Sequence, residues 1–261
     1  IGIEEIRINK KMNELKFSKE TNAKLKSIKE WSPIDKPRVY SFSLLSGFSC
    51  PKALDCQTYA VADKVTGKRK VVDGKHSEFR CFSAIQEAQY NETYNQRKHN
   101  FDSLLEHKED AYKMFALIEN SLPVNADYIR VHVGGDFFNE NYMLAWYMVA
   151  KLYPSIKFYA YTKSIRWMSE LEYLRPDNFS MIASYGSKED ALIDELNLKS
   201  ADVVFHPSET DKPIDHNEYY AINDKGSFSL LLHGTQKQGS KGSEALSKMN
   251  KENIKYSYSK K

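Results

Sequence analysis

The stretch IRVHVGGDFFNENYMLAWYMVAKLYPSIKFYAYTK, residues 129–163, constrains the fold more than any other part of the sequence. An apolar run is followed by two glycines, by a segment with aromatic and aliphatic residues at helical spacing, and by a second apolar run. This order predicts a strand over 127–133, a helix over 142–154 and a strand over 156–163. Two strands joined through a helix run parallel with a right-handed crossover, so we expect an α/β protein.

The same alternation of strand and helix continues after residue 163 and has one earlier member. Five or six parallel strands with helices between them predict a partial or complete TIM-like barrel, or an open doubly wound sheet. The further predicted strands lie at 38–46, 179–184, 201–207 and 227–234, with helices at 169–176 and 187–199.

The rest of the chain reads as a polar lead, an inserted hairpin and a polar tail. Residues 1–37 are lysine-rich with a weak helical pattern, and 236–261 are basic and rich in Gly, Ser and Lys. We therefore place the α/β domain, of the type that carries catalytic sites, at 38–235. Within it, 60–80 predicts a hairpin or ordered loop, and helical patterns cover 81–107 and 108–121.

Composition limits the class of protein. The 261 residues contain 41% hydrophobic residues, enough for the core of one large domain. Three cysteines argue against a secreted disulfide framework, and neither a signal peptide nor a run long enough to cross a membrane is evident. We expect a cytoplasmic protein, with no membrane partner, whose oligomeric state the sequence leaves open.

The net charge of +3 is small, but two local clusters are basic, TGKRKVVDGKH at 66–76 and YNQRKHN at 94–100. Together with the 17 tyrosines they could contact a nucleotide or nucleic acid, with rings stacking on bases. The alternative is a solvated set of lysines beside a tyrosine-rich core.

All three cysteines, Cys50, Cys56 and Cys81, follow the first predicted strand, two of them in the loop GFSCPKALDC. Soft thiolates suit Zn²⁺ or an iron–sulfur cluster. Three cysteines would leave one iron of a cluster open for a substrate or cofactor, whereas Zn²⁺ would take His76 as a fourth ligand. The alternative is that the cysteines are inert and buried, where they behave as small hydrophobic residues.

The turn VGGD after the strand at 127–133 is a second candidate site. Alternation places His132, Gly134 and Asp136 on one face, so that both polar side chains could line a pocket as catalytic residues. Gly134 and Gly135 permit close approach of a cofactor to the main chain, beside Asp136. The alternative is a tight turn in which Asp136 caps the following helix and His132 packs inside.

Polar residues also end the next two predicted strands. Lys163 closes the strand at 156–163 and could hold an anion or act on a substrate, and Ser184 closes the strand at 179–184. The carboxyl ends of parallel strands are where α/β proteins place their sites, so we add Lys163 to the catalytic candidates and Ser184 to the cofactor-binding ones.

Four segments together carry a resemblance to a known family. They are FSLLSGFSCPKALDC, FRCFSAIQEAQYNETYNQRKHNFD, the stretch from IRVHVGGD to YAYTKS, and LLHGTQKQGSKGSEAL, in that order over about 38–246. The sequence resembles the bacteriophage proteins named after gene product eighty-eight of a mycobacteriophage. That resemblance implies a phage protein working in the host cytoplasm, and it implies no particular activity.

A more distant likeness carries chemistry. The order of strand, cysteine loop, strand, Gly-Gly-acid turn, helix and strand is similar to radical S-adenosylmethionine enzymes. That likeness implies a [4Fe–4S] cluster held by Cys50, Cys56 and Cys81, and a cofactor, S-adenosylmethionine, bound at the open iron.

The likeness further implies that Gly134, Gly135 and Asp136 contact the amino group of that cofactor. The sequence departs from the pattern because Cys81 lies 25 positions after Cys56 instead of three. Thr58-Tyr59-Ala60 also stands where some relatives have Cys-Tyr-Ala.

Three hypotheses follow. The first is a phage metalloenzyme of the radical type that modifies a nucleotide, a nucleic acid or a peptide. The second is a zinc-containing barrel transglycosylase, similar to enzymes that exchange a deazaguanine base into DNA or RNA, with Asp136 as the nucleophile and Cys50, Cys56, Cys81 and His76 as zinc ligands. The third is a non-enzymatic protein that binds nucleic acid or a host protein.

Overall fold

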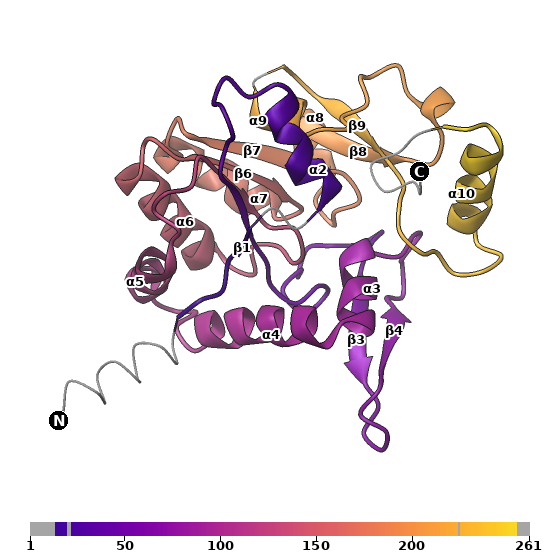
Figure 1. Ribbon diagram of the computed structural model, residues 1–261, viewed down its shortest axis with the longest axis horizontal. Coiled ribbons are helices and arrows are strands. Elements are labelled where there is room, and N and C mark those ends of the chain that lie inside the picture. Colours follow the sequence, from indigo (N-terminus) through magenta and orange to yellow (C-terminus); the bar gives the residue numbers. More distant parts are fainter. Residues whose placement is uncertain (1–13, 20–21, 224, 255–261) are drawn as a thin grey trace.

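The computed structural model describes residues 14–19, 22–223 and 225–254. Seven strands form one sheet in the order β1-β2-β5-β6-β7-β8-β9 (Figure 1). β1 pairs antiparallel with β2, and every later neighbour pair is parallel. The strands of this sheet are β1 Ser18–Lys19, β2 Val39–Phe42, β5 Tyr128–Val131, β6 Lys157–Thr162, β7 Phe179–Ser184, β8 Ser200–Val204 and β9 Phe228–Leu231.

The parallel strands follow one another in sequence order, so each crossover leads to the adjacent strand. The predicted α/β class and the mostly parallel sheet are therefore confirmed. Within the described ranges the sheet stays open, with β1 and β9 at its edges, and no closed barrel forms. The register places Ser41 of β2 opposite Arg130 of β5.

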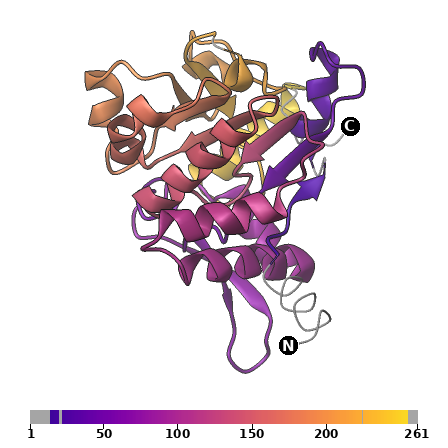
Figure 2. The ribbon, with the colours of Figure 1, turned by 90° about the vertical axis from the view of Figure 1, so that its left-hand side faces the viewer.

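One face of the sheet is covered by helices and is apolar. α6, Glu140–Leu152, begins where the Asn139 side chain accepts a hydrogen bond from the amide of Tyr142. Its Trp146 is fully buried against Phe42 and Phe158 of the strands. The other helices on this side are α5 Ala111–Ser121, α7 Ile165–Glu170 and α8 Ala191–Glu195 (Figure 2).

The opposite face has a thinner cover. Leu25 and Ile28, from α2 Ala23–Lys26 and the 3₁₀ helix η1 Ser27–Glu30, are fully buried there with Ala221 of α9 Tyr219–Ile222. The described part of the predicted polar lead thus adds an edge strand and a small helix to the sheet. Residues 1–13 of that lead lie outside the described residues.

A separate two-stranded hairpin, β3 Thr58–Ala62 with β4 Arg69–Asp73, extends away from the sheet. The hairpin predicted within 60–80 is confirmed. The helix predicted over 81–107 is interrupted at Tyr90, whose backbone is extended, so that α3 Phe82–Gln89 and α4 Asn91–Leu105 are separate helices.

The tail contains a helix that the sequence analysis did not predict. α10, Lys241–Lys251, is capped by the Ser240 side chain and buries Met249 beside Val204 and Leu231. Residues 255–261 lie outside the described residues. The remaining short elements are the 3₁₀ turns η2 Glu172–Leu174 and η3 Pro207–Glu209. Among the described helices none is both long and apolar enough to cross a membrane.

Candidate metal and ligand site

The cysteine loop leaves the carboxyl end of β2 and is held in place by its backbone. Gly47 has a φ of +76°, and a Cβ there would lie 2.6 Å from the carbonyl oxygen of Thr58, so this turn requires glycine. The Leu54 amide donates to the Gly186 carbonyl after β7 over 2.9 Å, and the Glu78 amide donates to the Asp55 carbonyl over 2.8 Å. The loop therefore joins the end of β7 to the segment that leads to Cys81.

Cys56 and Cys81 line one cavity, and Cys50 lies within electrostatic range of both of these free thiols. Each is partly exposed, and burial is the main cause that raises the pKa of each one, to about 11 for Cys81. Negative charge on Cys56 or Cys81 would raise the pKa of Cys50 further, and charge on Cys56 would raise that of Cys81. The thiols thus lie within electrostatic range of one another and remain protonated at neutral pH unless a cation binds.

Two hydroxyl groups link the segments that carry the thiols. The Thr58 hydroxyl donates to the Cys56 carbonyl and accepts from the Cys81 amide, both over 3.2 Å. The Ser49 hydroxyl donates to the Leu45 carbonyl over 2.7 Å and accepts from the Asp136 amide over 3.3 Å. The positions of the cysteines are therefore fixed relative to each other and to the turn after β5.

Glu87 anchors the same loop to the helix that begins after Cys81. Its buried carboxylate accepts from the Ser46 amide and hydroxyl, and from the Arg97 guanidinium over 2.9 Å. Burial is the main cause that raises the pKa of Glu87, although Arg97 opposes it. Sequence analysis did not select these two residues, which lie ten positions apart on two helices.

The two glycines after β5 allow close packing. A Cβ on Gly134 would lie 2.0 Å from the Ser83 hydroxyl, and one on Gly135, where φ is +87°, would lie 2.6 Å from the Ser49 hydroxyl. The Gly134 amide already donates to a serine hydroxyl, that of Ser43, over 3.3 Å. Packing alone thus accounts for both glycines, and their predicted cofactor contact stays a prediction.

Asp136 is buried and held by three hydrogen bonds. Its Oδ1 accepts from the Thr162 hydroxyl over 2.6 Å and from the Phe137 amide over 2.7 Å, and its Oδ2 accepts from the Lys163 amide over 2.8 Å. Burial raises its pKa to about 6, against the opposing effect of these donors. A carboxyl group with this pKa changes its charge near neutral pH, beside Cys50 and Cys56.

Lys163 and Ser184 meet at the ends of neighbouring strands. The buried Lys163 ammonium donates to the Ser184 hydroxyl over 3.3 Å and to the carbonyl of Tyr185. Its positive charge opposes the rise in the pKa of Cys56. The two predicted residues therefore occupy the same site as the thiols.

His132 lies elsewhere, in the helix-covered core. Its Nε2 lies 2.8 Å from the Tyr142 hydroxyl, and its ring packs against Phe42 and Phe137. Burial, with a smaller effect of Arg130, lowers its pKa to about 3. His132 does not line the cavity described below, and its predicted catalytic role stays a prediction.

His76 is exposed in the segment after β4. Across the described ranges no three His, Cys, Asp or Glu side chains are placed to hold one metal ion. The ligand set of three cysteines and His76 is therefore not assembled around a single ion in this structure.

A cavity of about 150 Å³ opens beside the thiols on the thinly covered face. Cys56, Cys81, Lys163 and Ser184 line one part of it. The remaining lining is basic or apolar apart from Asp215 and His233, and it comprises Lys24, Phe79, Arg80, Phe82, Arg130, Asp215, Val203, Leu230, Leu231, Leu232 and His233. A ligand in this cavity would touch two of the three cysteines.

A buried charge cluster supports the far side of the cavity. Glu218, fully buried, accepts from Arg130 over 2.7 Å and from the Tyr161 hydroxyl over 2.9 Å, and pairs with Lys24 at 3.4 Å. Burial would raise the pKa of Glu218, but Arg130 and Lys24 outweigh it and lower that pKa. Sequence analysis missed this cluster, although Arg130 in an apolar strand was a signal that could have indicated it.

Comparison with known proteins gives one clear relationship. The profile of the family "Gene product 88" matches residues 7–252. A curated relative, the "Gene 88 protein" of Mycobacterium phage L5, is 30% identical over 112 residues, which is 38% of this chain and 46% of that protein. The chain thus spans less than half the length of this relative, and no solved structure matches. Because the family profile covers nearly all of the sequence, the chain belongs to the Gene product 88 family.

Proposed function

We propose that this protein is a metalloenzyme in which Cys50, Cys56 and Cys81 together bind an iron–sulfur cluster, and that it modifies a nucleotide or nucleic acid. The observation that carries the proposal is that Cys56 and Cys81 line one cavity beyond the carboxyl edge of a parallel sheet, with Cys50 within electrostatic range of both. Sites of α/β proteins lie at this edge.

We propose a cluster rather than a single ion, because a cluster has its ligands farther apart. The described side chains offer no group of three ligands for one ion, yet the thiols influence each other's charge. In a [4Fe–4S] cluster each thiolate binds a different iron, so the three sulfur atoms stand farther apart than around one ion. Sequential parallel strands also agree with a partial barrel, the architecture that the likeness to radical S-adenosylmethionine enzymes implies.

Three protein ligands would leave one iron for a small molecule, for which we propose S-adenosylmethionine. A cluster of this kind supplies single electrons to the molecule bound at its open iron. Lys163 and Ser184 lie where they would orient an anionic or hydroxyl group of that molecule. Asp136, with a pKa of about 6, would accept or donate a proton near neutral pH.

The test is anaerobic purification and reconstitution with iron and sulfide. We expect iron and sulfide in equal amounts, a broad visible absorption that dithionite bleaches, and a further spectral change when S-adenosylmethionine is added. The matched control is Cys81→Ser, which keeps the shape of the side chain and removes one thiolate. Intact protein that takes up neither iron nor sulfide would contradict the proposal.

Zinc content separates this proposal from the base-exchange transferase. Asp136 would be the nucleophile of that second candidate, but it does not line the cavity and both of its carboxylate oxygens accept hydrogen bonds. The exposure of His76 weighs against its structural zinc site. Aerobically purified protein that contains zinc without iron would favour the transferase, and protein without metal under both conditions would favour a binding protein.

A further inference from the structure

The turn of the β3–β4 hairpin projects beyond the rest of the molecule in two perpendicular views (Figures 1 and 2). This turn is ordered by Asp63, whose carboxylate accepts from the amides of Val65 and Thr66 and from the Thr66 hydroxyl. These donors, the Thr66 amide first, lower the pKa of Asp63, so this carboxylate stays charged and holds the turn. Val65 at the tip is 93% exposed.

The turn end of the two-stranded ladder, where Arg69 pairs with Ala62, is braced against two helices. The Arg69 guanidinium donates to the Glu87 carbonyl over 2.9 Å and to the Asn91 side chain, and it lies 4.4 Å from the centre of the Tyr94 ring. Such a brace fixes the direction of the ribbon. The hairpin is therefore a preformed projection, which lowers the entropic cost of binding through it.

Four exposed lysines lie on the hairpin or directly after it. Lys64, Lys68, Lys70 and Lys75 are exposed, and none of them takes part in an ion pair of the described residues. With Arg69 they make five basic residues against two acidic ones over 58–75, a net charge of +3, which equals that of the whole chain. The ribbon is thus a local site of positive charge on the surface.

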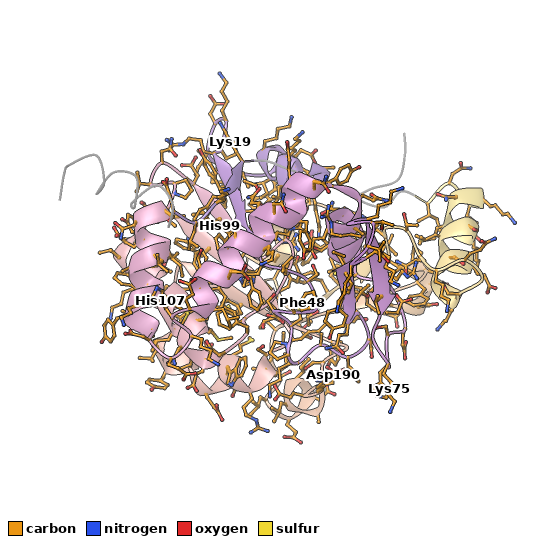
Figure 3. The ribbon with its side chains drawn as sticks, turned by 90° about the horizontal axis from the view of Figure 1, so that it is seen from below. Lys19, Phe48, Lys75, His99, His107 and Asp190 are labelled. Atoms are coloured by element: carbon orange, nitrogen blue, oxygen red, sulfur yellow. The ribbon has the colours of Figure 1, made fainter. Side chains whose placement is uncertain are left out.

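The outer face of the ribbon is apolar and aromatic. Tyr59 pairs with Val72, and Val61 pairs with Lys70, so these four side chains share a face. The half-exposed ring of Phe48 packs edge-on against Tyr59 with ring centres 5.1 Å apart. In the view from below, Phe48 lies between α4 and the hairpin (Figure 3).

This aromatic pair stands next to the thiol site. Phe48 is two residues from Cys50, and negative charge on Cys50 would raise the pKa of Tyr59, which burial raises first. A ligand that follows the outer face of the ribbon toward its base would therefore arrive beside the cysteine loop.

We propose that the outer face of the β3–β4 hairpin, with Phe48, binds single-stranded nucleic acid, the exposed lysines contacting phosphates and the aromatic pair stacking on an unpaired base. Basic side chains beside exposed rings are the two features that single-strand binding requires. The inference deepens the proposed function, since it names the substrate class and its route to the site, but the binding itself needs no metal.

Both features together favour nucleic acid over an acidic protein. An acidic peptide would satisfy the lysines and would leave the rings without a flat partner. A duplex would keep its bases stacked on each other, so Phe48 and Tyr59 would gain little from it. The single strand is the ligand that uses the charge and the rings at once.

The test is fluorescence anisotropy with a labelled single-stranded oligonucleotide, as DNA and as RNA, over a range of salt concentrations. Lys68→Glu with Lys70→Glu should weaken binding at low salt by about tenfold or more, and should reduce the salt dependence by about one for each lost phosphate contact. The matched control is Lys29→Glu with Lys157→Glu, exposed lysines away from the hairpin that change the net charge equally.

A separate variant tests the contribution of base stacking on the Phe48 ring. Phe48→Ala should weaken binding by about tenfold and leave the salt dependence unchanged, because a ring carries no charge. Tyr173→Ala is the control, since that ring is 80% exposed elsewhere on the surface. Circular dichroism and thermal unfolding confirm that each variant is folded before its affinity is compared.

Three results would overturn the inference. They are equal affinity of the hairpin pair and its control pair, tighter binding of a duplex than of its single strand, and competition by polyglutamate as strong as by the oligonucleotide. Binding is also measured on the wild-type protein before and after anaerobic reconstitution with iron and sulfide. Oligonucleotide binding by protein that takes up neither would show that the proposed function fails while this inference holds, and cluster uptake without oligonucleotide binding would show the reverse.

Discussion

The two faces of the central sheet differ sharply in chemistry, although the same strands supply both. In β5, Ile129 is fully buried toward the helix-covered core, whereas the neighbouring Arg130 reaches the buried pair with Glu218 and the cavity. The helix-covered face needs only shape and apolar area to be stable. The other face buries charges, which cost free energy unless they are paired, and Cys56 and Cys81 line its cavity. We infer that the first face stabilises the fold and the second serves the site.

Trp146→Ala should have the largest effect on stability. Its ring is fully buried among Phe42, Tyr142 and Phe158, so its removal should cost about 4 kcal/mol of unfolding free energy. Urea unfolding followed by circular dichroism measures this loss. The fraction of protein that remains folded should bind iron and sulfide as the wild type does. Folded variant protein that fails to bind the cluster would show that the helix-covered face also serves the site.

Glu218→Gln should come next, with a loss of about 3 kcal/mol, because Arg130 and Lys24 would keep buried charges without a partner. The folded-state pKa of Glu218 is lowered, so its contribution is present above the unfolded pKa of about 4.3 and is lost as pH falls through the folded value. The difference in unfolding free energy between wild type and variant should therefore shrink on acidification. A difference that stays constant with pH would show that the carboxylate charge is not the stabilising element.

Gly135→Ala tests the packing that joins the turn after β5 to the cysteine loop. The new Cβ would meet the Ser49 hydroxyl and Leu44 at a φ of +87°, at a cost of about 2 kcal/mol. Gly67→Ala is the control, because its φ is also positive but its Cβ would meet open space, so it carries the backbone strain alone. Only Gly135→Ala should also reduce the uptake of iron and sulfide. Equal uptake by both variants would show that the packing of this turn does not position the cysteine loop.

Asp136→Asn should have the smallest effect, seen in the pH dependence. The pKa of Asp136 is raised to about 6, so its ionised form opposes folding above that pH, and wild-type stability should gain about 1 kcal/mol from this group between pH 7 and pH 5. The amide side chain of the variant does not titrate, so the gain should be absent from it. Buried histidines affect both proteins alike, and parallel curves would show that Asp136 does not titrate in this range.

The sequence predicted the elements that local patterns specify. The β5–α6–β6 unit was found because its hydrophobic period changes from strand to helix and back, with glycines at the turn. The position of Cys50 and Cys56 at the carboxyl edge of the sheet followed from their loop after a parallel strand, and the shared metal site with Cys81 stays a prediction. By contrast, Tyr90 interrupts a helix without glycine or proline, and nothing local marks that break.

Other features could not be predicted because they depend on contacts between distant segments. Arg130 and Glu218 are 88 positions apart, and only the folded chain brings them together. α10 lies in a polar segment rich in Gly, Ser and Lys for which no helix was predicted, but burial of Met249 beside β8 and β9 stabilises it as a helix. His132 was expected in a pocket, and its pairing with Tyr142 places it in the core instead.

The central claim is that three cysteines act as one binding site, and thiol alkylation read by mass spectrometry tests it most directly. After anaerobic reconstitution, Cys50, Cys56 and Cys81 should resist alkylation together, although each is partly exposed in the metal-free fold. Serine at any one of the three positions should restore the reactivity of the other two. Cysteines that react independently of one another, with or without iron and sulfide, would contradict the account.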